Sequence, residues 1–166
     1  MKRIGVISDS HSTFDDTLRH FLRDVDEIWH AGDFGSMEIA DEIASFKPLK
    51  GVYGNIDGGV MRRSYTEFSL FECENKRVLM THIGGYPKHY PEHIIKKLKE
   101  EKPDIFLCGH SHILKIMYDL DLDFLLINPG ACGRQGFHLK STLVKFCLDN
   151  GKAKDLDIME FDKHNK

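Results

Sequence analysis

The sequence predicts a layered α/β fold with two packed sheets and helices on the outside. In the first third of the chain, short apolar runs alternate with amphipathic stretches, a pattern typical of strand–loop–helix units. Later in the chain the apolar runs follow one another more closely, so a β-rich half lies beside an αβ half. The length of 166 residues, with 41% hydrophobic and 30% charged residues, fits a single globular domain.

The first half of the chain alternates strands with helices. We predict strands over three short apolar runs, at 3–7, 27–30 and 49–53. The first helix is expected over 13–22, where apolar side chains share one face and Ser12 or Thr13 serves as the N-cap. The second helix is expected to begin at Ser36 and to end before Pro48.

The second half is richer in strands. Runs at 68–73 and 78–81 flank Glu74-Asn75-Lys76, which predicts a hairpin turn. An amphipathic helix is expected over 90–101, ahead of Pro103. Further strands are expected at 105–108, 113–118, 125–128, 143–148 and 154–160, the last two joined by Asp149-Asn150-Gly151.

Composition and charge exclude several classes of protein. The formal net charge of −3 argues against a nucleic-acid coat or a polybasic membrane binder. No apolar run approaches the ~18 residues of a membrane helix, and Met1-Lys2-Arg3 does not open a signal peptide. Four cysteines without a C-x-x-C pair indicate reduced thiols. We expect a soluble cytoplasmic protein that binds no membrane and forms no stable nucleic-acid complex.

Polar clusters that follow short apolar runs are the candidates for chemistry. There are five of them: Asp9-Ser10-His11, Gly32-Asp33, Gly54-Asn55, His82 and Gly109-His110-Ser111-His112. Open α/β sheets bind ligands at the carboxyl ends of their strands, so these clusters converge if the strands lie side by side. Mixed imidazole and carboxylate ligands suit first-row divalent metals. The candidate ligands exceed what one tetrahedral zinc uses, which indicates two ions sharing one carboxylate.

Each cluster alone is a weak signal. A G-D or G-N dipeptide is usually only a turn, and a D-x-H pair is common without a metal. Two histidines in G-H-S-H after a buried strand are harder to accommodate without a partner. The order of all the clusters in one chain carries the inference, and a glycine beside a ligand would let the backbone approach the ion or substrate.

From Asp9 to about Arg134 this order resembles the calcineurin-like metallophosphoesterase superfamily, whose motifs are D-x-H, G-D, G-N-H-D/E, a histidine, and G-H-x-H. The short chain and Asn128-Pro129-Gly130 are similar to its small bacterial and archaeal phosphodiesterase branch. The resemblance implies a four-layer α-β-β-α sandwich of two mixed sheets flanked by helices, in one domain over 1–162, with a polar tail at 163–166.

The resemblance also implies roles for individual residues. Asp9, His11, Asp33 and His112 match the ligands of a first metal. Asp33, Asn55, His82 and His110 match those of a second, with Asp33 bridging. The catalytic residues implied are Asp33, Asn55 and His110. The ions are expected to be Mn²⁺, with Ni²⁺, Zn²⁺ or Fe²⁺ as alternatives, and a metal-bridging hydroxide would attack a small phosphodiester substrate.

This chain departs from the family pattern in two places. Ile56 stands where larger relatives carry a histidine thought to protonate the leaving group, which puts general acid catalysis in doubt. Ile83 is inserted between His82 and Gly84 and is expected only to reshape a loop. Two other functions stay open: a phosphomonoesterase of the same fold, and a non-catalytic scaffold like the vacuolar sorting subunit that shares it. A homo-oligomer is also left open.

Two further residues, His30 and Arg134, have two interpretations each. His30 is either a partner that orients a metal ligand or a hydrogen-bonded core histidine. Arg134 either contacts a phosphate oxygen or faces solvent. His138 matches no family motif, so no role is expected for it.

Overall fold

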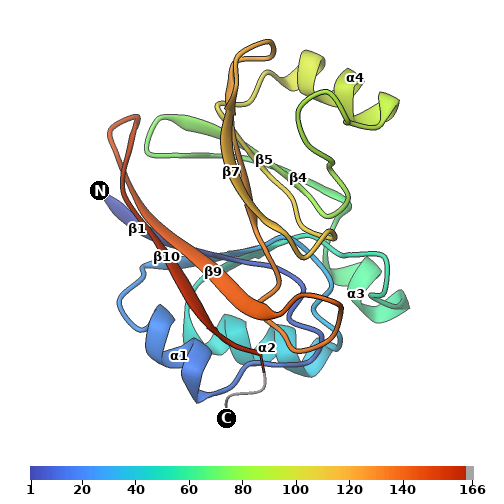
Figure 1. Ribbon diagram of the computed structural model, residues 1–166, viewed down its shortest axis with the longest axis vertical. Helices are drawn as coiled ribbons and strands as arrows, with labels where there is room; N and C mark the ends of the chain where they lie inside the picture. The colour runs from blue at the N-terminus through green and yellow to red at the C-terminus, as the bar shows by residue number, and fades with distance from the viewer. Residues whose placement is uncertain (164–166) are drawn as a thin grey trace.

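The computed structural model describes residues 1–163, which form two five-stranded sheets packed face to face (Figure 1). The first sheet has the strand order β10-β9-β1-β2-β3, with bounds β1 Lys2–Ile7, β2 Glu27–His30, β3 Leu49–Gly51, β9 Lys140–Asp149 and β10 Lys152–Asp162. The second has the order β4-β5-β6-β8-β7, with bounds β4 Phe68–Cys73, β5 Lys76–Thr81, β6 Ile105–Leu107, β7 Leu114–Asp119 and β8 Phe124–Pro129. Both sheets mix parallel and antiparallel pairs.

Helices cover the outer faces of the sheets. In Figure 1, helices α1 (Asp16–Leu22) and α2 (Met37–Phe46) lie below the first sheet, and α4 (Glu92–Glu101) lies above the second. A short helix, α3 (Gly59–Ser64), follows the first sheet's edge strand β3. This arrangement confirms the predicted four-layer α-β-β-α sandwich.

Three clusters of buried side chains fill the spaces between the layers, and strand alternation assigns residues to them. In β1, Ile4 and Val6 face the cluster between the sheets, whereas Ile7 faces the cluster beneath α1 and α2. In β5, Val78 faces the other sheet and Leu79 faces α4. Successive strand residues point to opposite faces, so strands buried on both faces read as continuous apolar runs.

Parallel strands bring the polar loops to one edge. Strands β1, β2 and β3 are parallel neighbours in the first sheet, and β5 and β6 are parallel neighbours in the second. The loops after these five strands carry all the candidate ligands. The five runs therefore do not lie in one sheet: the two sheets face each other and supply the loops jointly.

The expected helix over 13–22 is wrong at its start. Helix α1 begins at Asp16, and the carboxylate of Asp15 caps it by accepting the Leu18 N–H at 3.1 Å. Ser12 does not cap this helix because its φ of 65° belongs to the left-handed region. The segment ahead of α1 instead pairs with the loop after β2, since the Ser12 N–H donates to the Phe34 carbonyl at 2.7 Å.

Other differences are small. Helix α3 was not among the expected helices. Helix α4 begins at Glu92 rather than at 90, with Pro91 as its N-cap. The expected domain end coincides with the end of β10 at Asp162; of the expected tail, 164–166 lies outside the described residues. The four cysteines are buried and form no disulfide within the described residues. Within the described residues, no helix is long and apolar enough to cross a membrane.

Candidate metal centre

The loops at the shared edge bring most of the predicted ligands together. Five of the seven form two overlapping groups, Asp9–His11–His112 and Asp9–Asp33–His82, and in each group the ligand atoms lie within 4.8 Å of one another. The remaining two lie beside them: His110 Nδ1 is 3.0 Å from Asn55 Oδ1, and the His110 ring packs edge-on against His82.

Asp9 belongs to both groups. Its Oδ2 accepts hydrogen bonds from the Ser8 hydroxyl at 2.7 Å and the His110 N–H at 3.0 Å. Its Oδ1 points at the imidazoles, 3.2 Å from His112 Nε2 and 3.7 Å from His82 Nε2. Burial would raise the pKa of Asp9, but the neighbouring imidazoles of His11, His112 and His82 hold it well below its usual range. The carboxylate is therefore ionised and aimed at the site.

Asp33 also reaches histidines of both groups. Its Oδ1 accepts the Ile56 N–H at 3.0 Å, so its Oδ2 is turned inward. Oδ2 lies 3.1 Å from His82 Nε2 and 3.7 Å from His11 Nε2. The carboxylates of Asp9 and Asp33 thus lie between the imidazoles. Each has one oxygen close to a histidine of both ligand groups.

Hydrogen bonds on the far side of the rings select the tautomer. The Ala31 carbonyl lies 2.7 Å from His82 Nδ1, so that nitrogen carries the proton and Nε2 keeps its lone pair. His110 Nδ1 donates to Asn55 Oδ1 in the same way. A metal ligand needs a free ring nitrogen, and these contacts present Nε2 for that purpose.

The tautomer of His112 is fixed by hydrogen bonds that run through a second imidazole, that of His138. The Gly133 carbonyl lies 3.0 Å from His138 Nε2, so His138 donates there and its Nδ1 becomes an acceptor. His112 Nδ1 lies 3.2 Å from that acceptor and donates to it. Burial lowers the pKa of His138, which favours the neutral ring that this chain requires.

Three buried side-chain atoms within residues 1–163 have no hydrogen-bond partner: Asp9 Oδ1, His11 Nε2 and His82 Nε2. Leaving a buried polar group unpaired costs ~1–3 kcal/mol. All three atoms face the same space between the sheets, and carboxylate oxygen with imidazole nitrogen is a donor set for divalent transition metals. The residues present therefore fit metal ions, because cations would satisfy all three atoms.

The backbone at the ligands is unusual. Five of the seven candidate ligands have a positive φ: Asp9 (53°), His11 (43°), Asp33 (60°), His110 (71°) and His112 (62°). Such residues cost about 1–3 kcal/mol each and persist where the surrounding structure holds them. Here the Asp9 N–H donates to Gly32 and the His11 N–H donates to Asp33 across the two loops.

Two of the expected glycines are required by close approach. A Cβ on Gly54 would lie 2.0 Å from Asp33 Oδ1, and one on Gly109 would lie 2.0 Å from Ser8 Oγ. Any larger residue would displace the carboxylates that these glycines abut. The glycines are thus required by close approach to side chains of the site, whereas their predicted approach to an ion or a substrate stays a prediction.

Two residues to which the sequence analysis assigned no role, Asp57 and His138, support the site. Asp57 is buried, and its carboxylate accepts the N–H groups of Phe34, Gly35 and Gly54, at 3.2, 3.0 and 2.8 Å. Asp57 thereby joins the loop after β2, which carries Asp33, to the loop after β3, which carries Asn55. The available signal for Asp57 was its place at the acidic position of the G-N-H-D/E motif, whereas His138 lies in no motif and is identified only by the fold.

The structure decides between the two interpretations of His30, and it places Arg134 in an ion pair that neither of its two interpretations included. His30 is fully buried and stacked on Phe34, with ring centroids 3.7 Å apart. It accepts the Gly32 N–H and bonds Ser10 Oγ, so it is a hydrogen-bonded core histidine, and burial lowers its pKa to about 3. Arg134 forms an ion pair with Asp15, 2.5 Å between Nη2 and Oδ2.

Ile56 and Ile83 are both partly exposed near the site. The side chain of Ile56 is 48% exposed, so it does not pack against the sheet, and only its backbone N–H contacts a ligand. Ile83 is 43% exposed and lies in the loop after His82. Neither side chain can transfer a proton.

The carboxylates and imidazoles on the strand-end loops of this sandwich define a candidate metal-binding site. The profile of the calcineurin-like phosphoesterase superfamily domain matches residues 1–151, and the chain belongs to that superfamily. It is 35% identical over 136 residues to a probable metallophosphoesterase of Methanothermobacter thermautotrophicus, an alignment that covers 77% of this chain and 76% of the relative.

Solved structures agree in fold. Vps29 of Chaetomium thermophilum superposes with a TM-score of 0.75 at 14% identity, covering 97% of each chain. A structure described as a novel archaeal phosphodiesterase superposes with a TM-score of 0.71 at 21% identity, covering 95% of this chain and 99% of the other. At these identities the likeness establishes the fold alone.

Proposed function

We propose that the protein is a metal-dependent phosphodiesterase with a dinuclear centre. The observation that carries the proposal is the set of three unpartnered buried atoms, Asp9 Oδ1, His11 Nε2 and His82 Nε2. They belong to two overlapping ligand groups, which accounts for two ions rather than one. The archaeal phosphodiesterase of the same fold and the probable metallophosphoesterase in sequence support a phosphoester substrate.

We assign the first ion to Asp9, His11 and His112, and the second to Asp33, His82, Asn55 and His110. Asp33 bridges in this assignment, because its Oδ2 lies near a histidine of each set. Bound divalent ions supply charge that stabilises a phosphoryl group and lower the pKa of a bound water. Mn²⁺ is the ion we expect, with Ni²⁺, Zn²⁺ or Fe²⁺ as alternatives.

The protein's own groups orient the substrate. Asn55 and His110 are exposed and joined by a 3.0 Å hydrogen bond, so they form the solvent-facing rim of the centre. We place them against the phosphoryl oxygens. Ile56 at the rim cannot protonate the leaving group, which leaves His110 or water for that step. The substrate is therefore a small phosphodiester with a good leaving group, and we place the protein in the cytoplasm.

The test uses chelator-treated protein reconstituted separately with Mn²⁺, Ni²⁺, Zn²⁺ and Mg²⁺. Each sample is assayed on bis(p-nitrophenyl) phosphate, p-nitrophenyl phosphate and cyclic nucleotides. We expect hydrolysis of the aryl diester only with added metal, and more with Mn²⁺ or Ni²⁺ than with Mg²⁺. Activity on the monoester alone would assign a phosphomonoesterase instead.

One observation favours a second candidate. The fold is shared along the whole chain with Vps29 proteins, which makes a non-catalytic scaffold the alternative. The buried, unpartnered ligand atoms argue against it, because a scaffold gains nothing from them. Metal binding at full stoichiometry without hydrolysis of any phosphoester would favour the scaffold.

A further inference from the structure

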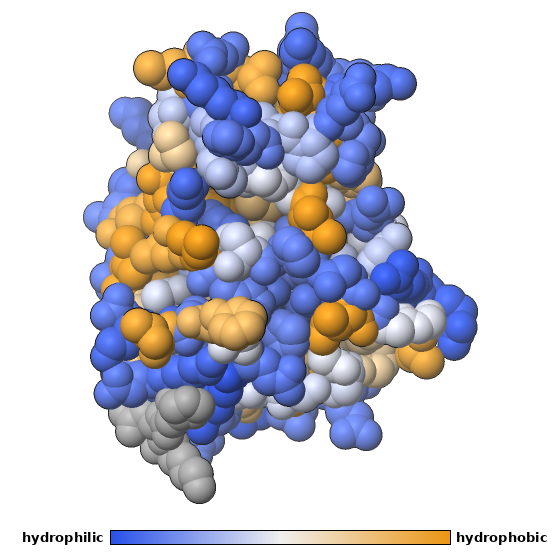
Figure 2. Space-filling view, turned by 45° about the vertical axis from the view of Figure 1, so that its right-hand side comes forward, coloured by the Kyte–Doolittle hydropathy of each residue, from blue (hydrophilic) through white to orange (hydrophobic). Residues whose placement is uncertain are grey.

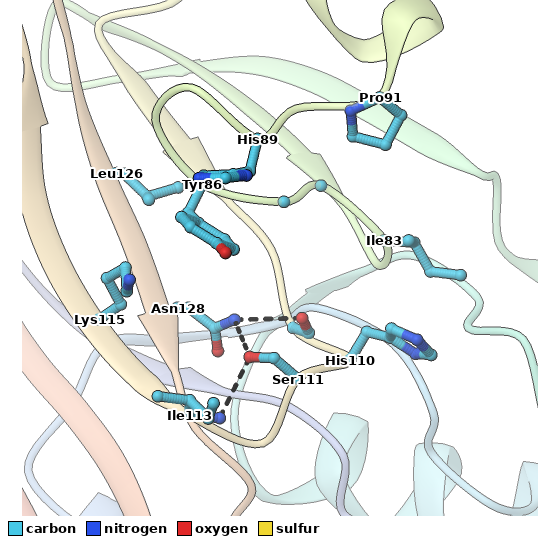
Figure 3. A pocket seen from close by; sticks show the side chains of 13 residues that line it. Ile83, Tyr86, His89, Pro91, His110, Ser111, Ile113, Lys115, Leu126 and Asn128 are labelled. Carbon is cyan, nitrogen blue, oxygen red and sulfur yellow. Dashed lines mark hydrogen bonds between the residues drawn. The ribbon is translucent and has the colours of Figure 1, made fainter.

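A cavity of about 320 Å³ adjoins the metal centre on the side of the second sheet. The loop after β5, the loop after β6, and strands β7 and β8 form it, and Figure 3 shows the side chains that line it. Its volume is at the lower end of the range for small-molecule sites, about 300–1,000 Å³.

The cavity and the metal centre share one loop. The His110 N–H donates to Asp9 on the metal side. The next residue, Ser111, turns to the cavity, where its hydroxyl and the Gly109 carbonyl each accept from Asn128 Nδ2 at 3.1 Å. Figure 3 shows His110 on one side of the cavity and Lys115 on the other. A phosphoryl group at the metal ions would therefore hold its organic substituent next to this cavity.

The walls are largely apolar. Ile83 and Tyr86 are each 43% exposed and Ile113 is 62% exposed, and all three line the cavity. Apolar side chains reach the surface in separate places among hydrophilic ones on the face in Figure 2, so exposed apolar residues are not unusual here. What distinguishes these three is that they converge on one concave site beside a candidate catalytic residue.

The cavity carries one cation and no acid. Lys115 Nζ lies 4.3 Å from the centroid of the Tyr86 ring, and within the described residues it forms no ion pair with a carboxylate. The Tyr86 ring also packs against His89, and in Figure 3 its hydroxyl points toward Ser111 and Asn128. Lys115 and these polar groups offer hydrogen-bond donors to an acceptor atom inside an otherwise apolar site.

We infer that this cavity is the subsite for the organic group of the substrate, and that it takes a single planar aromatic ring system bearing a hydrogen-bond acceptor. The apolar walls bind the ring, Lys115 binds the acceptor, and the absence of an acidic group disfavours cationic substituents. A nucleobase or a nitrophenyl ring has this chemistry, whereas a simple alkyl group does not. The inference rests on the proposed function for the placement of the phosphoryl group.

The test measures binding and not turnover. Calorimetric dissociation constants are compared for benzylphosphonate and methylphosphonate on the Mn²⁺-loaded protein, because benzylphosphonate places a ring where a phenyl ester would hold it. We expect benzylphosphonate to bind about tenfold tighter or more, from burial of the ring. Ile113→Glu should remove most of this preference. Val60→Glu is the matched control, since Val60 is 53% exposed and does not line the cavity.

A second pair of ligands tests whether Lys115 binds a hydrogen-bond acceptor on the aromatic ring. The wild-type protein should bind 4-nitrobenzylphosphonate more tightly than benzylphosphonate, and Lys115→Met should abolish that difference. Equal binding of benzylphosphonate and methylphosphonate by the wild-type protein would overturn the subsite, even with full diester hydrolysis. A benzyl preference lost in Ile113→Glu would uphold the subsite even in a protein that hydrolyses no diester.

Discussion

Replacing His138 should weaken one metal site and leave the other intact. His138 Nδ1 accepts a hydrogen bond from His112 Nδ1 at 3.2 Å, and His138 Nε2 donates to the Gly133 carbonyl at 3.0 Å. In His138→Ala, His112 loses the contact that keeps the proton on Nδ1, so Nε2 is no longer reserved for a metal. Partners of this kind are worth about 10–100-fold in metal affinity, or ~1.4–2.8 kcal/mol.

The loss of metal affinity should be confined to the ligand group that contains His112. The group of Asp9, Asp33 and His82 has its own fixed tautomer through Ala31, which His138 does not contact. Calorimetric titration of metal-free protein with Mn²⁺ should therefore show one weakened step and one unchanged step. In parallel, the ¹⁵N shifts of His112 should show Nδ1 protonated in the wild-type protein and mixed tautomers in the variant.

Two further variants separate positioning from folding. His138→Gln can accept from His112 and donate to Gly133, so it should recover most of the affinity. His93→Ala removes an exposed histidine of α4 and should change neither step. Unchanged binding of both ions by His138→Ala, or unaltered His112 tautomers, would refute the role of His138.

The remaining predictions concern three other positions. Asp33→Asn should lose one or both ions and the diesterase activity together, which metal analysis and turnover would show; full metal content with full activity would exclude Asp33 as a ligand. Ile56→His should make the rate less dependent on leaving-group acidity across a series of graded aryl diesters, with little loss of stability because the side chain is exposed; equal slopes would show that no acid is missing. The pKa of His30 is lowered to about 3, so only the unfolded chain takes up its proton between pH 6.5 and 3. The free energy of unfolding should then fall by about 1.4 kcal/mol per pH unit on acidification, and His30→Gln should flatten this dependence in urea titrations.

The sequence predicts the layers and most of the site because both depend on local patterns. Apolar runs of strand length, such as Ile105 to Cys108, mark strands buried on both faces, and the polar residues that follow them mark the strand ends. The start of α1 was mispredicted because Ser12 is a good capping residue type, whereas its backbone is committed to pairing with the loop after β2.

Long-range partners could not be predicted. His138 approaches His112 from 26 residues away, through a loop with no motif. The cavity beside His110 depends on how the loop after β5 lies over β7 and β8, which periodicity does not specify. The candidate metal ligands can be recognised locally, from the neighbouring glycines and from the spacing between ligands. A residue that orients a ligand, such as His138, has no such local pattern.

The left-handed backbone of the ligand loops limits which side chains can serve there. Asn, Asp and His, with Gly, are the residue types that adopt this conformation most readily, while β-branched residues are strained in it. At the positions of Asp9, His11, Asp33, His110 and His112 the main chain therefore selects oxygen and nitrogen donors. Converting this centre to one that holds a soft ion through thiolates would require rebuilding the loops before exchanging the side chains.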